Sequence, residues 1–397
     1  LQIGPGTYRL MDESPDTLQF GRANATPESF VTIQAEPGVR PRLLGSLSTA
    51  GRAWESTAPG VWRLSADFLP HDPTGMFLGE RRVRHATEIR NGTRSHARVA
   101  ALTTTNQWTK ADANGAGCDP ANAGCYIYYM PPNGEVPLNE TYELAQRGLL
   151  YGGSSYLLVR GLELAYTQAA AFSFEGGRGQ IVDDNVLSHN SNSNDNAYSV
   201  FISYGGGARV CRNRVFDSEY WGGTPNSKGI TFMTMRPDDP SIVEDNEIYD
   251  IVGQGIATKG GVSHLVVRRN YVHEVGLAIE GTDGRCDWTL PNCTQSDPEY
   301  FPGGAWDVYE NLLVHNRTGF SVYVTATNPS ADNRVYNNVF ADNGSAVTLP
   351  PALFGTVLAN NIFVGNERAV YLDHGGSGTT ASVADFLPNF TSDHNLF

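Results

Sequence analysis

The sequence predicts an all-β fold, a right-handed parallel β-helix, and three observations support this prediction. First, one pattern recurs from about residue 150: an apolar residue, two variable residues, Asn, one variable residue and a further apolar residue, as in 182–187. Second, successive asparagines of this pattern lie 23 to 41 residues apart, which suits one turn of a solenoid. Third, the runs between them are short, β-rich and interrupted by glycine, so they do not suit helices.

The recurring asparagines should form a ladder inside the solenoid. They are Asn185, Asn213, Asn246, Asn270, Asn311, Asn338 and Asn361, and the chain ends on the same element at Asn395. Successive turns stack about 4.8 Å apart, so an inward-turned Asn can bond its side-chain amide to those above and below it. We therefore expect one inward stack with a structural role.

The pattern divides the chain into three segments. Residues 1–50 should form the first turns of the β-helix, and residues 51–147 should form an inserted β-rich segment. Residues 148–397 should form the main parallel β-helix, in which residues 280–304 are a loop within the 41-residue step.

Composition excludes several classes of protein. Of the 397 residues, 40% are hydrophobic and 18% are charged, and no run of about 18 apolar residues occurs, so we expect neither a disordered chain nor a membrane-spanning helix. The formal net charge of −14 disfavours general binding of nucleic acid, because it repels phosphate. Only three lysines occur, Lys110, Lys228 and Lys259, so each deserves inspection.

The cysteines indicate an oxidising compartment. Cys118 and Cys125 share one Gly- and Pro-containing loop, and Cys286 and Cys293 share another, so we expect two local disulfides and a free Cys211. The chain opens on a strand-and-turn sequence with no leader pattern, and seven Asn-x-Ser/Thr triplets occur. We expect a secreted or cell-surface protein whose leader lies outside this chain.

The front of the chain resembles the opening turns of pectate-lyase-like β-helix proteins. The resemblance rests on PGTYRL at 5–10 and FVTIQAEPGVRPRLLGS at 30–46. TAPGVWRL at 57–64 and MFLGERRVRHAT at 76–87 resemble a small β-rich insertion of bacterial β-helix carbohydrate enzymes. This fold hosts lyases, hydrolases, epimerases and adhesins, so the resemblance implies fold more than activity.

One column of residues differs from the Asn-, Ser- and Gly-rich remainder. Glu175, Tyr204, Arg236 and Lys259 lie nine to eleven residues before their ladder asparagines, and Glu280 follows in the next turn. In stacked turns these side chains should line one edge, about 5 Å per step. A long groove of this kind suits an extended polysaccharide.

Lys259 is the sharpest catalytic candidate. GQGIATKGGVSHLVVRRN at 253–270 resembles the strand–Lys–turn–Asn segment of the polysaccharide lyase family that contains chondroitinase B and alginate lyases. The resemblance implies that Lys259 is the base of a β-elimination beside a uronate carboxylate, with Arg236 lowering its pKa. Where that family carries arginine one turn later, this chain has Glu280.

Other residues complete the expected site. The aromatic side chains of Tyr220, Trp221, Trp288 and Trp306, together with Glu175, are candidates for binding sugar rings. Asp283 and Asp287 are candidate Ca²⁺ ligands in the 280–304 loop. A carboxylate pair, Glu280 with Asp283 or Glu175 with Asp195, would instead suit a glycoside hydrolase.

The leading hypothesis is a secreted, monomeric lyase that cleaves a uronate-containing polysaccharide, with Ca²⁺ as the only candidate cofactor. Two alternatives stay open: a glycoside hydrolase that uses a carboxylate pair, and a non-catalytic β-helix scaffold or adhesin that binds glycans. An enzyme needs the candidate residues in one cleft with shifted pKa values, whereas a scaffold would scatter them.

Overall fold

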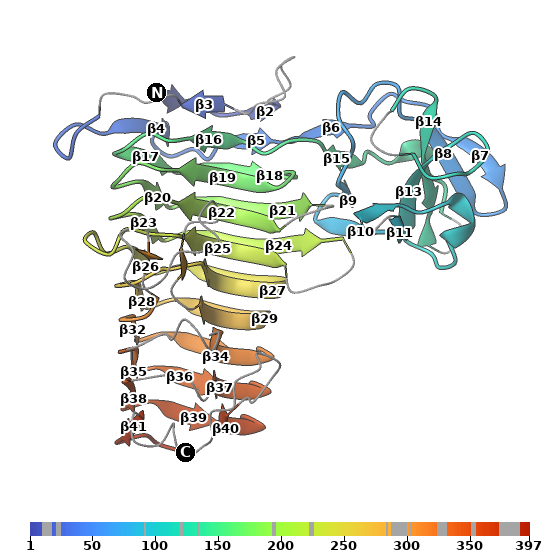
Figure 1. The fold of residues 1–397 in the computed structure, drawn as a ribbon. Coiled ribbons are helices and arrows are strands. Elements are labelled where there is room, and N and C mark those ends of the chain that lie inside the picture. Colours follow the sequence, from blue (N-terminus) through green and yellow to red (C-terminus); the bar gives the residue numbers. More distant parts are fainter. Residues whose placement is uncertain are drawn as a thin grey trace.

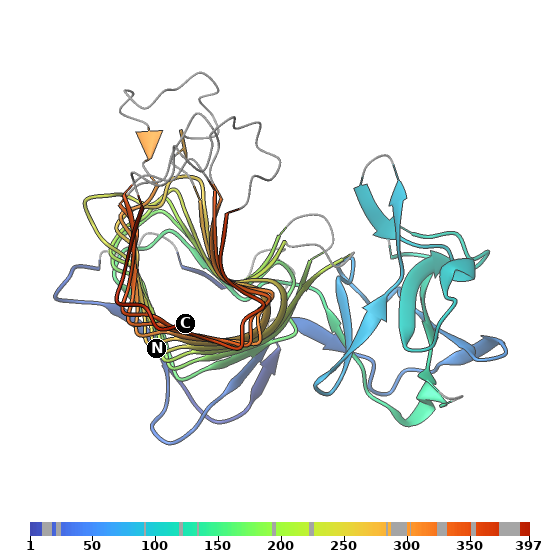
Figure 2. The same ribbon diagram turned by 90° about the horizontal axis from the view of Figure 1, so that it is seen from below.

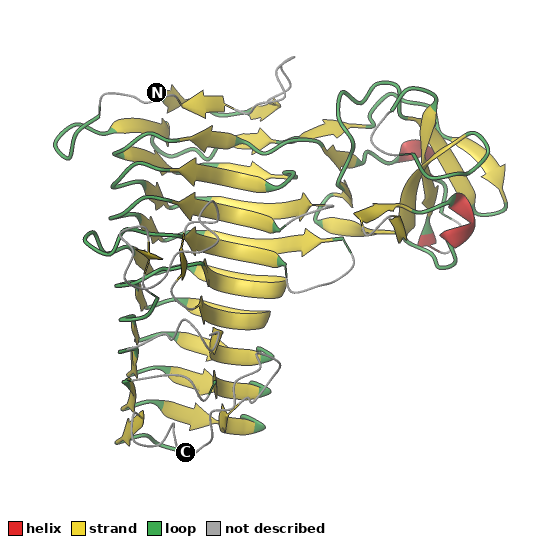
Figure 3. Cartoon of the chain, in the orientation of Figure 1, coloured by secondary structure: helices red, strands yellow, loops and turns green. Residues whose placement is uncertain are grey.

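A computed structural model gives the fold of the chain. It describes residues 1–9, 18–20, 25–90, 93–118, 122–132, 135–192, 196–221, 226–282, 285–286, 300–301, 303–323, 332–350, 355–372 and 390–397. The described chain is almost entirely β-structure, as Figure 3 shows. Its short 3₁₀ helices include η1 (Val99–Ala101) and η3 (Pro137–Asn139).

The chain winds into a right-handed parallel β-helix, which confirms the predicted fold class. The turns stack from the N-terminal to the C-terminal end of a column (Figure 1), and the view along the column shows that they superimpose as rings around a common interior (Figure 2). Each complete turn contributes one strand to each of three parallel sheets. The long strands β27 (Glu247–Lys259) and β29 (Tyr271–Thr282) bend at a corner and belong to both the second and the third sheet.

The first sheet contains eleven short strands. They are β1 (Gln2–Ile3), β4 (Val31–Ala35), β17 (Leu157–Arg160), β20 (Ile181–Asp183), β23 (Arg209–Cys211), β26 (Ile242–Glu244), β28 (Val266–Arg268), β32 (Asp307–Tyr309), β35 (Arg334–Tyr336), β38 (Thr356–Ala359) and β41 (Phe390–Asp393).

The second and third sheets contain the remaining strands of the column. Besides β27 and β29, the second sheet holds β2 (Thr7–Arg9), β5 (Arg42–Leu44), β18 (Glu163–Ala165), β21 (Val186–Asn192), β24 (Arg214–Tyr220), β33 (Leu312–Val314), β36 (Val339–Ala341) and β39 (Ile362–Val364). The third holds β3 (Leu18–Phe20), β16 (Leu150–Gly152), β19 (Ala170–Glu175), β22 (Ala197–Ser203), β25 (Ser227–Met233), β34 (Thr318–Tyr323), β37 (Ser345–Leu349) and β40 (Arg368–Leu372).

The predicted asparagine ladder is confirmed between the first and second sheets. In each step the Oδ1 of one Asn accepts hydrogen bonds from the backbone N–H and the Nδ2 of the Asn in the preceding turn; for Asn246 and Asn270 these are 3.1 and 3.0 Å. The Nδ2 of Asn246 also donates to the Val210 carbonyl oxygen at 2.9 Å. The ladder runs from Asn185 to Asn395 and satisfies buried backbone groups at every bend.

A second asparagine ladder lies at the next corner, and the sequence analysis missed it. Asn316, Asn343 and Asn366 repeat the same geometry: the backbone N–H of each of the first two donates to the Oδ1 of the next, at 2.9 and 3.0 Å. Each stands five residues after an asparagine of the first ladder, so an Asn-x₄-Asn spacing was the available signal.

An apolar core fills the column from the first turns to the last described ones. Residues at equal positions stack in rows, such as Phe172, Val200, Ile230, Ile256 and Ile279, all of them buried. Alternate residues of each strand face outward, so the residues between these rows form the outer surface.

A mixed sheet, antiparallel except for the pair β10–β13, stands beside the upper turns of the column (Figure 1). Its strands are β6 (Ser46–Ser48), β7 (Glu55–Ala58), β8 (Val61–Ser65), β9 (Gly75–Leu78), β10 (Arg81–His85), β13 (Gln107–Asp112), β14 (Cys125–Met130) and β15 (Glu143–Ala145). We call this unit the insert; it also carries the hairpin β11 (Thr87–Arg90) and β12 (Thr93–His96). Its own core centres on Trp54, Trp108, Tyr129 and Tyr142. The last strand pair, β30 (Arg285–Cys286) with β31 (Tyr300–Phe301), belongs to the 280–304 segment.

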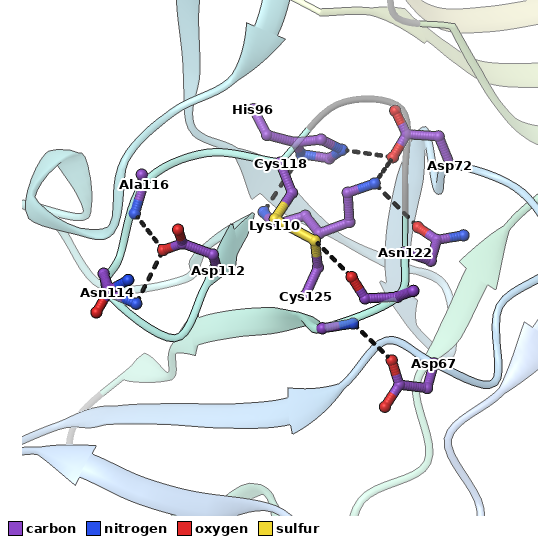
Figure 4. The surroundings of a disulfide bond; sticks show 12 residues. Asp67, Asp72, His96, Lys110, Asp112, Asn114, Ala116, Cys118, Asn122 and Cys125 are labelled. Carbon is purple, nitrogen blue, oxygen red and sulfur yellow. Dashed lines mark hydrogen bonds and ion pairs between the residues drawn. A yellow bond between two sulfur atoms is a disulfide. The ribbon is translucent and has the colours of Figure 1, made fainter.

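The Cys118–Cys125 disulfide of the insert is present as expected (Figure 4), and Cys211 is free and buried. The expected partner of Cys286, Cys293, lies outside the described residues. Burial raises the pKa of the Cys211 thiol to about 12, so this thiol is unreactive. Within the described part of the chain, no helix is long and apolar enough to cross a membrane.

Candidate functional site

Of the four residues predicted to form one column, two share a row in the structure, Glu175 and Lys259, and two do not, Tyr204 and Arg236. Strand register places Glu175, Ser203, Met233 and Lys259 in one row on the outer face of the third sheet. Tyr204 and Arg236 come one and three residues after this row, and Arg236 is exposed. Counting back from each Asn failed because the connection from the third to the first sheet varies in length.

A groove runs along this face of the third sheet near its N-terminal strands. It has a volume of about 430 Å³, and its lining includes Glu175 and Lys259 at one side and the rings of Tyr151, Tyr198 and Phe201. The Tyr198 and Phe201 rings stack with centroids 4.6 Å apart at 29°. Aromatic faces beside charged groups are typical of sites that bind sugar rings.

A hydrogen-bonded chain of three side chains crosses the same face at the next strands. Lys228 Nζ on β25 donates to Gln254 Oε1 on β27 at 2.6 Å, and Gln254 Nε2 donates to Glu280 Oε2 on β29 at 2.9 Å. Lys228 is only 5% exposed and Gln254 is equally buried. A buried ammonium needs such polar partners, because water no longer solvates it.

Glu280 lies on the strand next to that of Lys259. Glu280 pairs with Ala257 across β27 and β29, and Lys259 is two residues beyond Ala257 on the same face of β27. Both side chains are partly buried. Lys259 and Glu280, two of the predicted catalytic residues, therefore lie on neighbouring strands of one face.

Burial raises the pKa of Glu280 above its ordinary value. The charge of Lys228, the hydrogen bond from Gln254 and the charge of Arg317 act in the opposite direction but do not cancel this effect. Glu280 therefore keeps its proton to a higher pH than an exposed glutamate would, which suits a general acid.

Lys228 and Gln254 were not among the predicted site residues. For Lys228 the signal was available, since it is one of only three lysines in the chain. For Gln254 the sequence offered no signal, because its position opposite Lys228 depends on a strand register that includes an irregularity between Ile251 and Gln254.

Two predicted sugar-binding tryptophans are wrong, because both are buried structural residues. Trp306 is 2% exposed in the core of the column, where its Nε1–H donates to the Val262 carbonyl oxygen at 2.7 Å. Trp221 is 3% exposed and packs between the column and the insert, with its Nε1–H donating to the Thr74 carbonyl oxygen at 2.6 Å. Neither can stack on a polysaccharide in the groove.

The remaining predictions fall outside the described residues. These are Trp288, Asp283, Asp287 and Asp195, together with the side chain of Tyr220. In the described ranges, no group of three or more His, Cys, Asp or Glu side chains could hold a metal ion. The Ca²⁺ expectation, which rests on Asp283 and Asp287, stays a prediction.

Comparisons with known proteins agree with the fold. A family model described as right handed beta helix region matches residues 139–300. Among solved structures, the complex of XylC with xylose is similar with a TM-score of 0.60 at 13% identity, covering 94% of this chain and 64% of that one. A structure described as glycoside hydrolase gives a TM-score of 0.60 at 10% identity, covering 99% and 88%.

A search among curated proteins returned no match. Among the solved structures, this chain spans less than two thirds of the length of the XylC chain to which it is similar. At identities of 10–13%, the likeness establishes the β-helix architecture and leaves activity to be argued from the site.

Proposed function

We propose that the protein is a secreted polysaccharide-cleaving enzyme, and specifically a lyase that acts on a uronate-containing glycan. The observation that carries the proposal is the placement of Lys259 and Glu280 on neighbouring strands of one face, where Lys259 lines a groove with aromatic walls. The neighbours described as a glycoside hydrolase and as XylC with xylose add support for a carbohydrate substrate. The Cys118–Cys125 disulfide supports an oxidising, extracellular compartment.

The proposed reaction is a β-elimination that needs one base and one acid. Lys259, as the base, takes the proton from the sugar carbon next to the uronate carboxylate. The bond between C4 and the glycosidic oxygen breaks, a C4–C5 double bond forms, and the protonated carboxyl of Glu280 gives its proton to the departing oxygen. The positive charge of buried Lys228 favours the negative charge that develops on the uronate.

The described carboxylates of this face do not form the pair that a glycosidase needs. Glu175 on β19 and Glu280 on β29 are four strands apart, which corresponds to about 19 Å. Hydrolytic pairs stand roughly 5 to 10 Å apart. Hydrolysis remains the second candidate, because the raised pKa of Glu280 would equally suit the acid of a glycosidase.

One screen separates the two reactions. The purified protein is incubated with acidic and neutral polysaccharides, and each digest is measured for the ultraviolet absorbance of unsaturated uronates and for new reducing ends. A lyase gives both signals on a uronate polymer. New reducing ends without the absorbance would replace the lyase by a hydrolase, and neither signal on any substrate would favour the glycan-binding scaffold.

A further inference from the structure

A second cavity lies where the insert meets the column, away from the groove on the third sheet. It measures about 360 Å³, and its lining includes Arg84, His85 and Thr87 of the insert together with Glu219 and Trp221 at the end of β24. Interfaces between two structural units are common places for small-molecule sites, and this volume lies within the usual range for ligand pockets.

The insert supplies this cavity with a hydrogen-bonded series of buried and partly buried polar side chains. Lys110 is fully buried and forms an ion pair with Asp72, and the two lie beside His96 in Figure 4. Asp72 Oδ1 accepts from His96 Nε2 at 3.0 Å, His96 Nδ1 lies 2.8 Å from His85 Nε2, and His85 Nδ1 lies 2.8 Å from Thr87 Oγ1.

Only one arrangement of protons gives every hydrogen bond from Asp72 to Thr87 a donor and an acceptor. Burial would raise the pKa of Asp72, but the hydrogen bond from His96 and the charge of Lys110 outweigh it and leave this pKa lowered, so Asp72 is an ionised acceptor. His96 must then carry its proton on Nε2 and accept on Nδ1, where the Lys110 backbone N–H also donates at 3.3 Å. His85 consequently donates through Nε2 and accepts through Nδ1.

Thr87, the last member of this hydrogen-bonded series, presents a hydroxyl group to the cavity. Burial, with the neighbouring His96, places the pKa of His85 well below its ordinary value, so His85 is neutral and its Nδ1 stays an acceptor. The Thr87 hydroxyl therefore donates its proton inward to His85. Its oxygen lone pairs are left to accept a hydrogen bond from a ligand.

The opposite wall carries a carboxyl group with a shifted pKa. Burial raises the pKa of Glu219, Asp217 adds to the effect, and Arg82 only partly offsets it. Arg82 Nε holds both Asp217, at 2.8 Å, and Glu219, at 2.9 Å, which fixes the wall in place. The His85 ring, stacked on Trp221 at 3.6 Å, joins the two walls.

We propose that this junction cavity binds a neutral sugar ring, at a second carbohydrate site distinct from the groove on the third sheet. Its lining holds one guanidinium, Arg84, and one carboxyl group, Glu219, so neither sign of charge dominates, which favours an uncharged ligand over an anion. It offers an acceptor at Thr87, a carboxyl at Glu219 and guanidinium donors at Arg84, and this mixture suits the paired donors and acceptors of sugar hydroxyls.

The test is titration of the intact protein with neutral monosaccharides (glucose, galactose, mannose and xylose) and with glucuronic and galacturonic acids, followed by NMR. At least one neutral sugar should bind, and Thr87→Val should weaken its binding roughly tenfold, the worth of about one hydrogen bond to an uncharged partner. Thr87→Ser should restore binding, because it restores the hydroxyl. Thr104→Val, at an exposed threonine of the insert, is the matched control and should bind as the parent does.

Independent variants separate this site from the proposed lyase. Lys259→Ala should slow polysaccharide cleavage and leave monosaccharide binding unchanged, whereas Thr87→Val should weaken monosaccharide binding and leave cleavage unchanged. Failure of every neutral sugar to bind at millimolar concentration would overturn the inference. So would binding of the uronic acids alone, or binding that a correctly folded Thr87→Val variant retains in full.

Discussion

Glu280 and Glu175 lie on the same face of the third sheet yet differ in their surroundings. Glu175 is exposed at the rim of the groove, whereas Glu280 is partly buried and accepts a hydrogen bond from Gln254. Sequence spacing pointed to both as acids on one edge. Only the packing around Glu280, which depends on residues from three different turns, gives it the raised pKa that a proton donor needs.

Replacement of Lys259 tests the base. Lys259→Ala should lower the rate of polysaccharide cleavage by about two to four powers of ten, the usual contribution of a positioned base. Lys259→Arg should fail nearly as badly, since arginine stays protonated. Arg160→Ala, at an exposed arginine of the first sheet, serves as the control and should keep full activity. A Lys259→Ala variant with undiminished turnover would remove Lys259 from the mechanism.

The pH profile tests the acid. Because the pKa of Glu280 is raised, its carboxyl stays protonated to a higher pH, and activity should fall only as the pH rises through that value. The charged groups that face it, Lys228 and Arg317, oppose the shift. Gln254→Leu removes a hydrogen bond that favours the carboxylate, so this alkaline limb should move to higher pH. An unmoved limb in a folded Gln254→Leu variant would assign the titration to another group.

The repeated corners explain which elements the sequence could predict. The first ladder was predictable because its asparagine recurs in every turn with apolar neighbours at fixed offsets. The third-sheet row was only half predictable, since Glu175 and Lys259 share it while Tyr204 and Arg236 do not. Trp306 was misjudged because it follows the irregular 280–304 segment, where no periodicity tells an inward residue from an outward one.

The ladder should be most sensitive in its middle. Asn270→Ala removes the acceptor for the Asn246 backbone N–H and the donor to the Val243 carbonyl oxygen, both of them buried. Each unsatisfied buried group costs about 1–3 kcal/mol, so the free energy of unfolding should fall by several kcal/mol. The matched Asn395→Ala variant, at a partly exposed end of the ladder, should lose clearly less. Urea unfolding measures both, and equal losses would contradict a ladder that depends on burial.

For the molecule as a whole, the contact between insert and column depends on charge. Arg82 and Glu80 of the insert meet Asp217 and His189 of the column, with His189 Nε2 at 2.7 Å from Glu80 and His189 Nδ1 at 2.5 Å from Asp217. Burial would raise the pKa of Asp217, but Arg82 and His189 outweigh burial and lower it. An ionised Asp217 therefore holds the two units together.

The direction of the pKa shift of Asp217 determines how the stability of the fold changes as the pH falls. A carboxyl whose pKa is lower in the folded state stabilises the fold above its unfolded pKa, about 3.9, and this stability is lost as the pH falls through the folded value. Asp217→Asn should thus cost about 3 kcal/mol at pH 7 and progressively less as the solution is acidified. Asp238→Asn, at an exposed ion pair with Arg178, should change little at either pH. Thermal unfolding across pH measures the difference, and a cost that does not depend on pH would contradict this account.

The second asparagine ladder also limits how the protein can be produced. Asn316 and Asn343 each begin an Asn-x-Ser/Thr triplet, yet both side chains are almost wholly buried and donate to the carbonyl oxygens of Val272 and Leu313. An oligosaccharide joined to either amide would take the place of a donor proton and would have no room inside the filled column. In a eukaryotic expression host, secreted folded protein should therefore carry unmodified Asn316 and Asn343, and chains glycosylated there should be retained as misfolded material.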